Sequence, residues 1–161
     1  MVSDVNLRND FEDILEIEKS FEKSGWTRQM FLQQTERPGV TFLFVVRSVE
    51  GGSVDGYCAA LIVMDDLEIH RIAVRESGRR QGAGSALISE TLRRMANKGA
   101  KNVYLDVRKS NIGAQRFYEK FGFKETGGRR DYYENPREDA LVMSRSIKVL
   151  KGDSGCDTVK L

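Results

Sequence analysis

A short segment in the middle of the chain combines arginines with glycines, a composition that suits the binding of phosphate. It follows the apolar-rich stretch LEIHRIAV and precedes a predicted helix. Backbone N–H groups at the start of a helix lack intrahelical partners, the helix dipole favours negative charge, and glycines let the backbone approach an anion closely. The pattern therefore predicts a phosphate-collecting junction of strand, loop and helix over residues 67–86, with Arg75, Gly78, Arg79, Arg80, Gly82 and Gly84 in the loop.

The spacing of these glycines excludes the two most familiar phosphate loops. A Walker loop requires a lysine followed by serine or threonine after its last glycine, but Gly84 is followed by Ser85 and Ala86. A Rossmann loop requires G-x-G-x-x-G, and the third glycine is missing here. The remaining pattern, Arg79-x-x-Gly82-x-Gly84, suits a pyrophosphate held by backbone amides with arginines at its rim. A glycine-rich turn with solvated arginines remains the alternative interpretation.

The apolar periodicity places this junction in a chain of alternating strands and helices. Asn9, with a glutamate three residues later, predicts the capped start of a first helix, and Thr27 predicts the start of a second that ends before Pro38. Gly122 and Phe123 predict a Schellman end to the last helix. Helices are predicted at about 10–21, 28–37, 84–98 and 111–121, and strands at 2–7, 41–47, 56–64, 67–74, 103–108, 124–133 and 139–146, the second and third strands forming an antiparallel hairpin.

Length and composition indicate one globular domain. The chain has 161 residues, 40% of them hydrophobic and 31% charged, and we expect a domain over 1–147 with a C-terminal tail over 148–161. A net charge of +2 gives no overall nucleic-acid footprint, and one histidine with two cysteines disfavours a zinc site. The apolar runs fall short of the ~20 residues of a membrane span. These features predict a cytoplasmic protein that lacks a signal peptide and binds neither metal, nucleic acid nor membrane.

Two motifs, in this order, resemble the GNAT acetyltransferases. The first is R-x-x-G-x-G after I-A-V, and the second is N-x-x-A-x-x-x-Y-E-K-x-G-F from Asn111 to Phe123. The resemblance implies the α/β GNAT fold, with a twisted, mostly antiparallel central sheet, a parallel splayed pair in its middle and helices on both faces. It also implies acetyl-CoA as cofactor, with the pyrophosphate on the loop amides and the pantetheine beside the preceding strand. The implied cofactor-binding residues are Ile72, Ala73, Val74, Arg79, Arg80, Gln81, Gly82, Ala83, Gly84, Ser85, Asn111 and Tyr118.

A narrower resemblance covers about residues 2–147. It is to the RimI type, the N-terminal alanine acetyltransferases of ribosomal proteins, and to their archaeal and eukaryotic N-terminal acetyltransferase relatives. It rests on Trp26 before a short helix and on the stretch RRDYYENPREDALVM from Arg129. It implies transfer of acetyl from coenzyme A to the α-amine of a protein or peptide N-terminus, by direct attack in a ternary complex. Trp26, Tyr132 and Tyr133 would bind this substrate.

The resemblance offers two carboxylates as proton acceptors and one phenol as a proton donor. An α-amine has a pKa of ~7.7–8.0, so most of it is protonated near neutral pH and must lose a proton before it attacks a thioester. Glu68 matches the base of the histone-acetylating branch, whereas Asp106 stands where RimI-type enzymes carry the longer glutamate and would need a bridging water. We favour Glu68. Tyr118 would donate a proton to the leaving thiolate, and a backbone N–H near Ala73 or Val74 would meet the oxyanion.

Plainer interpretations remain for several of these residues. Trp26 fits a hydrophobic staple at the start of a helix. Tyr118 shares a helix face with apolar residues that indicate core, and Glu68 could simply face solvent. Because strand residues alternate between faces, Tyr132 and Tyr133 are predicted to lie one in the core and one in the pocket.

Two other functions remain open from the sequence. One is acetylation of a small-molecule amine, because the cofactor-binding motifs say little about the acceptor. The other is an acyl-CoA-binding subunit without turnover, which the aspartate at position 106 keeps open. Direct transfer requires no covalent intermediate, so Cys58 is not expected to act as a nucleophile. We expect a monomer or a homodimer.

Overall fold

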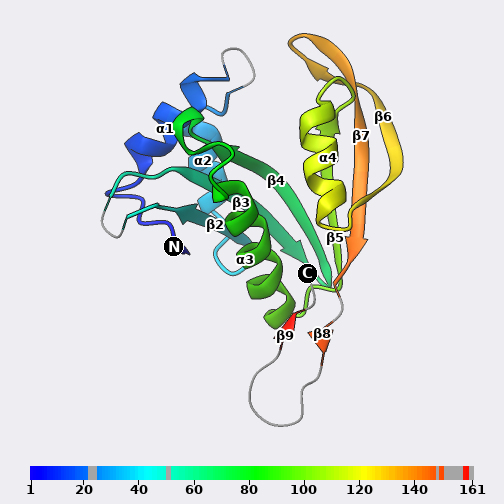
Figure 1. Cartoon of the computed structure of the whole chain (residues 1–161), viewed down its shortest axis with the longest axis horizontal. Coiled ribbons are helices and arrows are strands. Elements are labelled where there is room, and N and C mark those ends of the chain that lie inside the picture. The colour runs from blue at the N-terminus through cyan, green and yellow to red at the C-terminus, as the bar shows by residue number, and fades with distance from the viewer. Residues whose placement is uncertain (22–24, 50–51, 148, 151–157, 160–161) are drawn as a thin grey trace. The chain divides into compact units, whose positions relative to one another are not determined.

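The computed structural model (Figure 1) describes all residues except 22–24, 50–51, 148, 151–157 and 160–161. Each helix and strand predicted from the sequence has a counterpart, with ends that differ by a few residues. The helices are α1 (Phe11–Lys19), α2 (Arg28–Thr35), α3 (Ala83–Asn97) and α4 (Ile112–Lys120), and a 3-10 turn spans Glu76–Gly78. The strands are β1 (Val2–Asp4), β2 (Thr41–Val46), β3 (Gly56–Val63), β4 (Asp66–Val74), β5 (Asn102–Arg108), β6 (Lys124–Glu134), β7 (Arg137–Ser146), β8 (Val149–Leu150) and β9 (Thr158–Val159).

Seven strands form one sheet in the order β1-β2-β3-β4-β5-β7-β6. β4 and β5 pair in parallel, with Asp66–Ile69 beside Asn102–Leu105. The pairs β1–β2, β2–β3, β5–β7 and β6–β7 are antiparallel. The predicted α/β class, with a mostly antiparallel sheet and a parallel pair in its middle, is confirmed, as is the β2–β3 hairpin.

The chain divides into two compact units, residues 1–61 with 70–92 and residues 62–69 with 93–161. In the first unit, α1 and α2 contribute apolar side chains to a core shared with β2, β3 and β4. Phe31 of α2 is fully buried there, and its ring lies 5.3 Å from the ring of Tyr57 and 6.0 Å from that of Phe11. This aromatic cluster anchors both helices to the strands.

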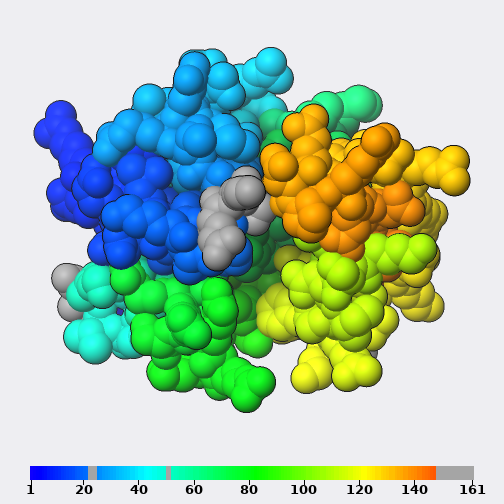
Figure 2. All heavy atoms as spheres, turned by 90° about the horizontal axis from the view of Figure 1, so that it is seen from above, coloured from blue at the N-terminus to red at the C-terminus, as the bar shows by residue number. Residues whose placement is uncertain are grey.

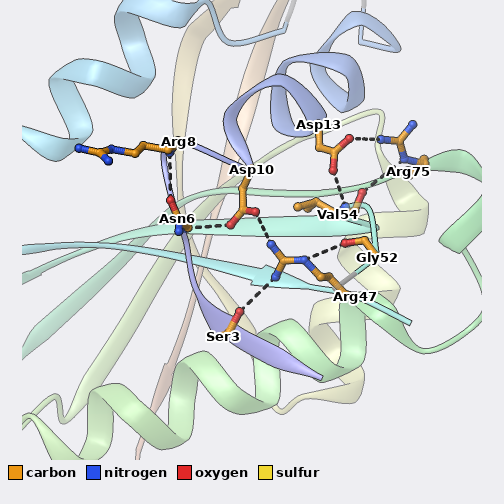
Figure 3. A network of polar contacts seen from close by, with 9 residues as sticks. All are labelled: Ser3, Asn6, Arg8, Asp10, Asp13, Arg47, Gly52, Val54 and Arg75. Atoms are coloured by element: carbon orange, nitrogen blue, oxygen red, sulfur yellow. Dashed lines mark hydrogen bonds and ion pairs between the residues drawn. The ribbon is translucent and has the colours of Figure 1, made fainter. Parts of the chain in front are cut away.

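The start of α1 corrects one sequence expectation. The N-cap residue is Asp10, not Asn9, and its carboxylate makes no capping hydrogen bond. Instead the carboxylate accepts a hydrogen bond from the Asn6 backbone N–H at 2.8 Å and pairs with the guanidinium of Arg47, which also donates to Ser3 Oγ at 3.2 Å (Figure 3). Because Asp10 is only 4% exposed, its charge requires a partner, and Arg47 supplies it.

In the second unit, β5 separates an apolar face from a polar one. Val103, Leu105 and Val107 are buried, whereas the residues between them, including Asp106, are half-buried. This is the alternation of a strand that packs on one side only. The β5–β7 register places Asp106 opposite Val142.

The end of α4 is the predicted Schellman motif. The Phe123 N–H donates to the Tyr118 carbonyl at 3.2 Å, the Gly122 N–H donates to the Glu119 carbonyl at 2.9 Å, and Gly122 has a φ of +79°. Glycine suits this left-handed position because it lacks a Cβ. The motif fixes the last turn of α4, where Tyr118 lies.

Among the described residues, no helix combines the length and apolar character needed to cross a bilayer. In that same part of the chain, no three His, Cys, Asp or Glu side chains cluster as metal ligands. In the predicted tail, β8 pairs antiparallel with β9. The remaining tail residues lie outside the described part of the chain.

Candidate functional site

The arginine and glycine loop connects the end of β4 to the start of α3, as predicted. Arg80 has a φ of +61° and Gly82 a φ of +88°, so the backbone turns sharply just before the helix. The Ala86 N–H donates to the Gly82 carbonyl at 2.8 Å as the helix begins. The amides of Ala83, Gly84 and Ser85 therefore belong to the first turn, whose N–H groups have no acceptor within the helix.

The side chains of the loop divide into two kinds. Arg79 and Arg80 are exposed, and Arg79 Nε donates to the Val74 carbonyl at 3.3 Å. Arg75 instead has a structural role. Its Nη2 lies 3.5 Å from Asp13 Oδ1, and its Nε donates to the Val54 carbonyl at 3.3 Å (Figure 3). Arg75 thus ties the loop to α1, and Arg79 and Arg80 remain as the arginines suited to an anion.

The last residues of β4 are the predicted pantetheine strand. Ala73 is buried, whereas Ile72 and Val74 are half-buried. A Cβ on Gly56 of β3 would lie 2.8 Å from the Ala73 carbonyl oxygen, so glycine permits the close approach of the two strands at this point.

Glu68 and Asp106 lie on one face of the parallel strand pair. Glu68 is opposite Tyr104 in the β4–β5 register. Tyr104 and Asp106 are two residues apart on β5 and therefore point to the same side. Glu68 is exposed and Asp106 half-buried. The structure thus places both candidate proton acceptors on the polar face.

Asp106 has two close neighbours on β6. Arg129 Nε lies 3.2 Å from Asp106 Oδ1, and the Arg129 guanidinium carbon is 5.4 Å from the centre of the Tyr132 ring. Burial is the main cause that raises the pKa of the Tyr132 phenol. The charge of Asp106 and the hydrogen bond between Asp106 and the phenol raise it further, and the charge of Glu68 adds a smaller increase. The phenol therefore stays protonated at neutral pH and senses both carboxylates.

A bulge in β6 explains how Arg129 and Tyr132 reach the same carboxylate. Residues three apart on a regular strand point to opposite faces. Here the register shifts between Arg129 and Tyr133, and Asp131 adopts a φ of +53°. The Asp139 carboxylate accepts a hydrogen bond from the Asp131 N–H at 2.9 Å, which helps to hold this conformation. The bulge interrupts the alternation and turns both side chains toward Asp106.

The prediction that one of Tyr132 and Tyr133 lies in the core is wrong. Tyr132 is 48% exposed, Tyr133 is half-buried, and their ring centres lie 5.1 Å apart. The Arg108 guanidinium carbon lies 4.2 Å from the centre of the Tyr133 ring. The reason is again the bulge, which removes the alternation on which the prediction depended. In Figure 2, α4 (yellow-green) and the β6–β7 connection (orange) of the second unit lie at the surface.

Tyr118 and Asn111 belong to α4 of the second unit. Tyr118 is half-buried, with its ring 5.2 Å from that of Phe117 and 5.7 Å from that of Phe123, so it is not a core residue. Asn111 Oδ1 accepts a hydrogen bond from the Ala114 N–H at 3.0 Å and caps the helix. A contact of Asn111 with a cofactor would therefore have to come from its amide nitrogen.

Trp26 forms the hydrophobic staple of α2. Thr27 Oγ1 accepts a hydrogen bond from the Met30 N–H at 3.3 Å, which confirms Thr27 as the cap. The half-buried Trp26 ring lies 5.2 Å from the ring of Phe31, and the two residues flank this cap at the positions typical of a staple. A substrate contact by Trp26 remains a prediction.

Cys58 of β3 is fully buried, and burial raises the pKa of its thiol to about 12. Such a thiol is a poor nucleophile at neutral pH because almost none of it is ionised. The expectation that Cys58 is not a nucleophile agrees with this environment.

Sequence reasoning missed Arg129 and the carboxylate Glu18. The partnership of Arg129 with Asp106 depends on the β6 bulge, for which the only sequence signal is the pair Gly127-Gly128 just before it. The sequence predicts Glu18 to be a solvated charge at the end of an amphipathic helix, yet it is 3% exposed. No local pattern distinguishes it from its solvated neighbour Glu16.

Comparison with known proteins agrees with this arrangement. The model of the Acetyltransferase (GNAT) family matches residues 11–123, a span that includes both the arginine and glycine loop and the motif ending at Phe123. A Bacillus subtilis (strain 168) protein described as a candidate ribosomal protein bS18-alanine N-acetyltransferase is 37% identical over 140 residues, which cover 86% of this chain and 91% of the relative.

Solved structures show the same fold. The ribosomal-protein-S18-alanine N-acetyltransferase from Escherichia coli has a TM-score of 0.82 and 26% identity, with 97% of this chain and 99% of the other covered. Ard1 from Thermoplasma volcanium has a TM-score of 0.79 and 28% identity, with 91% and 96% covered. With a family model that matches most of its length, the chain belongs to the GNAT family of acetyltransferases.

Proposed function

We propose that this acetyltransferase transfers acetyl from acetyl-CoA to the N-terminal α-amine of a protein. The observation that carries the proposal is the placement of two carboxylates, Glu68 and Asp106, on one face of the parallel strand pair, where Asp106 pairs with Arg129. A polar, acidic face suits a protonated α-amine that must lose a proton. The names of the Bacillus subtilis and Escherichia coli relatives make the N-terminal alanine of a ribosomal protein the first acceptor to test, and the cytoplasm the expected location.

The residues of the loop fit the diphosphate of coenzyme A. A Cβ at Gly82 would meet no atom within 4 Å, so the start of α3 is open on that side. The first-turn amides and the exposed Arg79 and Arg80 would hold the diphosphate, with Gln81 beside them. Ile72 to Val74 would hold the pantetheine arm, and Asn111 and Tyr118 would contact it from α4. Acetyl-CoA would supply the thioester, whose acetyl group forms the new amide bond while the thiol is released.

The chain's own groups divide the proton transfers. Asp106 is already paired with Arg129 at 3.2 Å and interacts with Tyr132. Glu68 is therefore favoured as the acceptor of the α-ammonium proton. Asp106 would keep Tyr132 and Arg129 in place along the peptide. Tyr118 would hold its proton at the phenol oxygen and donate it to the departing sulfur.

Thiol release in the presence of acetyl-CoA tests the proposal. The panel pairs an alanine-initiated peptide with the same peptide blocked at its α-amine, and adds a set of small amines. We expect release with the free peptide alone. Release only with small amines would identify a small-molecule acetyltransferase, and tight coenzyme A binding without any release would identify a non-catalytic acyl-CoA-binding subunit; either result would overturn the proposal.

A further inference from the structure

Glu18, a buried carboxylate near the end of α1, joins three segments of the first unit. It is 3% exposed. Glu18 Oε1 accepts hydrogen bonds from the Tyr57 hydroxyl of β3 at 2.6 Å and from Arg71 Nε of β4 at 3.2 Å. Oε2 accepts from Arg71 Nη2 at 2.8 Å and from the backbone N–H of Trp26. One side chain therefore fixes Trp26, which precedes the Thr27 cap of α2, against two strands.

The guanidinium of Arg71 and the phenol of Tyr57 keep their ordinary protonation states on burial. Burial by itself lowers the pKa of the Arg71 guanidinium and is the largest single influence, but the charges and hydrogen bonds of Glu18 and Tyr57 together outweigh it, so the pKa of Arg71 is raised. Burial, followed by the Glu18 charge, also raises the pKa of the Tyr57 phenol. Arg71 and Glu18 thus form a buried ion pair beside the neutral phenol of Tyr57. A buried ion pair is seldom the most stabilising way to fill a core, and fixed geometry is what it adds.

Phe21 extends the cluster toward the cofactor loop. The Arg71 guanidinium carbon lies 4.6 Å from the centre of the Phe21 ring, and that of Arg79 lies 5.9 Å from the same centre. Both distances are within the range of cation–π attraction. Contacts therefore run from the Trp26 amide through Glu18, Arg71 and Phe21 to Arg79.

We propose that Glu18 is a positioning residue that links the Trp26 end of α2 to the cofactor loop. Through it, occupation of the loop at Arg79 restrains Trp26 and so improves binding of the peptide. The inference rests on the proposed function, in which Arg79 contacts the cofactor and Trp26 the acceptor. Glu18 acts through other residues and touches neither substrate.

Trp26 is the only tryptophan of the chain, so its fluorescence reports on this segment directly. We expect titration with coenzyme A to change Trp26 emission in the wild type. Glu18→Gln should remove most of this change and raise the KM for peptide about tenfold at saturating acetyl-CoA, with kcat changed less than about threefold; a tenfold change lies within the usual range of couplings between sites. The matched control is Glu16→Gln on the same helix, whose side chain is 54% exposed and pairs only with Lys19 among the described ion pairs.

A second variant covers the case in which Glu18→Gln fails to fold, as judged by circular dichroism. Phe21→Leu keeps an apolar side chain but removes the ring beneath Arg71 and Arg79, and we expect the same loss of the Trp26 response. Unchanged Trp26 emission in the wild type, or variants that behave like Glu16→Gln, would overturn the positioning role even if the peptide is acetylated. A Trp26 response that depends on Glu18 in a protein that acetylates no peptide would support the link and refute the proposed acceptor.

Discussion

A carboxylate, a guanidinium and a phenol lie together in the first unit and again in the second, in contrasting environments. In the first unit, Glu18, Arg71 and Tyr57 form a cluster whose carboxylate side chain is 3% exposed. In the second unit, Asp106, Arg129 and Tyr132 form a cluster with side-chain exposures of 21% for Asp106 and 56% for Arg129. A buried carboxylate with all its hydrogen bonds made can hold elements in place, whereas one that a substrate can reach can also bind and exchange protons. Burial, not composition, separates a positioning cluster from a chemical one.

The largest expected effect is on the free energy of unfolding, which should fall much more when the buried cluster loses its carboxylate than when the exposed one does. Glu18→Ala leaves the Arg71 charge buried without its partner, so the free energy of unfolding should fall by ~3–5 kcal/mol. Asp106→Ala breaks a more exposed pair and should cost at most ~1 kcal/mol. Urea denaturation of both variants measures the difference. Equal losses would show that the two clusters do not differ in the way their burial implies.

Tyr118→Phe should give the largest loss of activity. Removing a proton donor from the leaving group lowers kcat by about 1,000-fold, within the usual range for general acid catalysis. The phenol contributes little to cofactor affinity in this account, so the Kd for acetyl-CoA should change less than about threefold. Steady-state kinetics and calorimetric titration provide the two values. A change confined to binding would refute the role assigned to Tyr118.

Substitutions of the two carboxylates on the polar face should lower kcat/KM to different extents. Glu68→Gln should lower kcat/KM about 100-fold at pH 7, and less at pH 9, where most of the α-amine is already deprotonated. Asp106→Asn should lower it only about tenfold, because Asp106 positions its neighbours. Rate profiles between pH 6 and 9.5 distinguish the two. If Asp106→Asn shows the larger and more pH-dependent loss, the assignments must be exchanged.

The smallest expected effect concerns the arginines. Arg129→Gln should change the free energy of unfolding by only ~0.2–1 kcal/mol, because its pair with Asp106 is partly solvated. Arg71→Gln leaves Glu18 buried without its counter-charge, so it serves as the matched comparison and should cost more than ~2 kcal/mol. Thermal unfolding of both variants at the same pH measures the two losses of stability. A larger loss for Arg129→Gln would contradict the distinction.

Much of the fold could be predicted because local patterns decide it. The helices and strands follow from apolar periodicity, and Thr27 and Gly122 take their predicted roles because capping involves only nearby backbone groups. The cap at Asn9 failed because its neighbour Asp10 is governed by Arg47, a residue distant in sequence. Local signals are reliable until a long-range charge competes with them.

The candidate site could be predicted only in part, for the same reason. The loop and the residues Glu68, Asp106 and Tyr118 were found through motifs. Arg129 beside Asp106 required the β6 bulge, which changes the faces of later side chains. Glu18 required knowledge of which elements pack against the end of α1. Neither a bulge nor burial of one charge in an amphipathic helix follows from periodicity.

The central claim is that the acceptor is an N-terminal α-amine. The most direct measurement is mass-spectrometric mapping of the acetyl group on one peptide that carries both a free N-terminal alanine and an internal lysine, after incubation with the protein and acetyl-CoA. The account predicts acetyl on the α-amine alone, because the ~10.4 pKa of a lysine amine makes its deprotonation far more costly at neutral pH. Acetyl on the lysine side chain, or a peptide left unmodified while a small amine is acetylated, would contradict it.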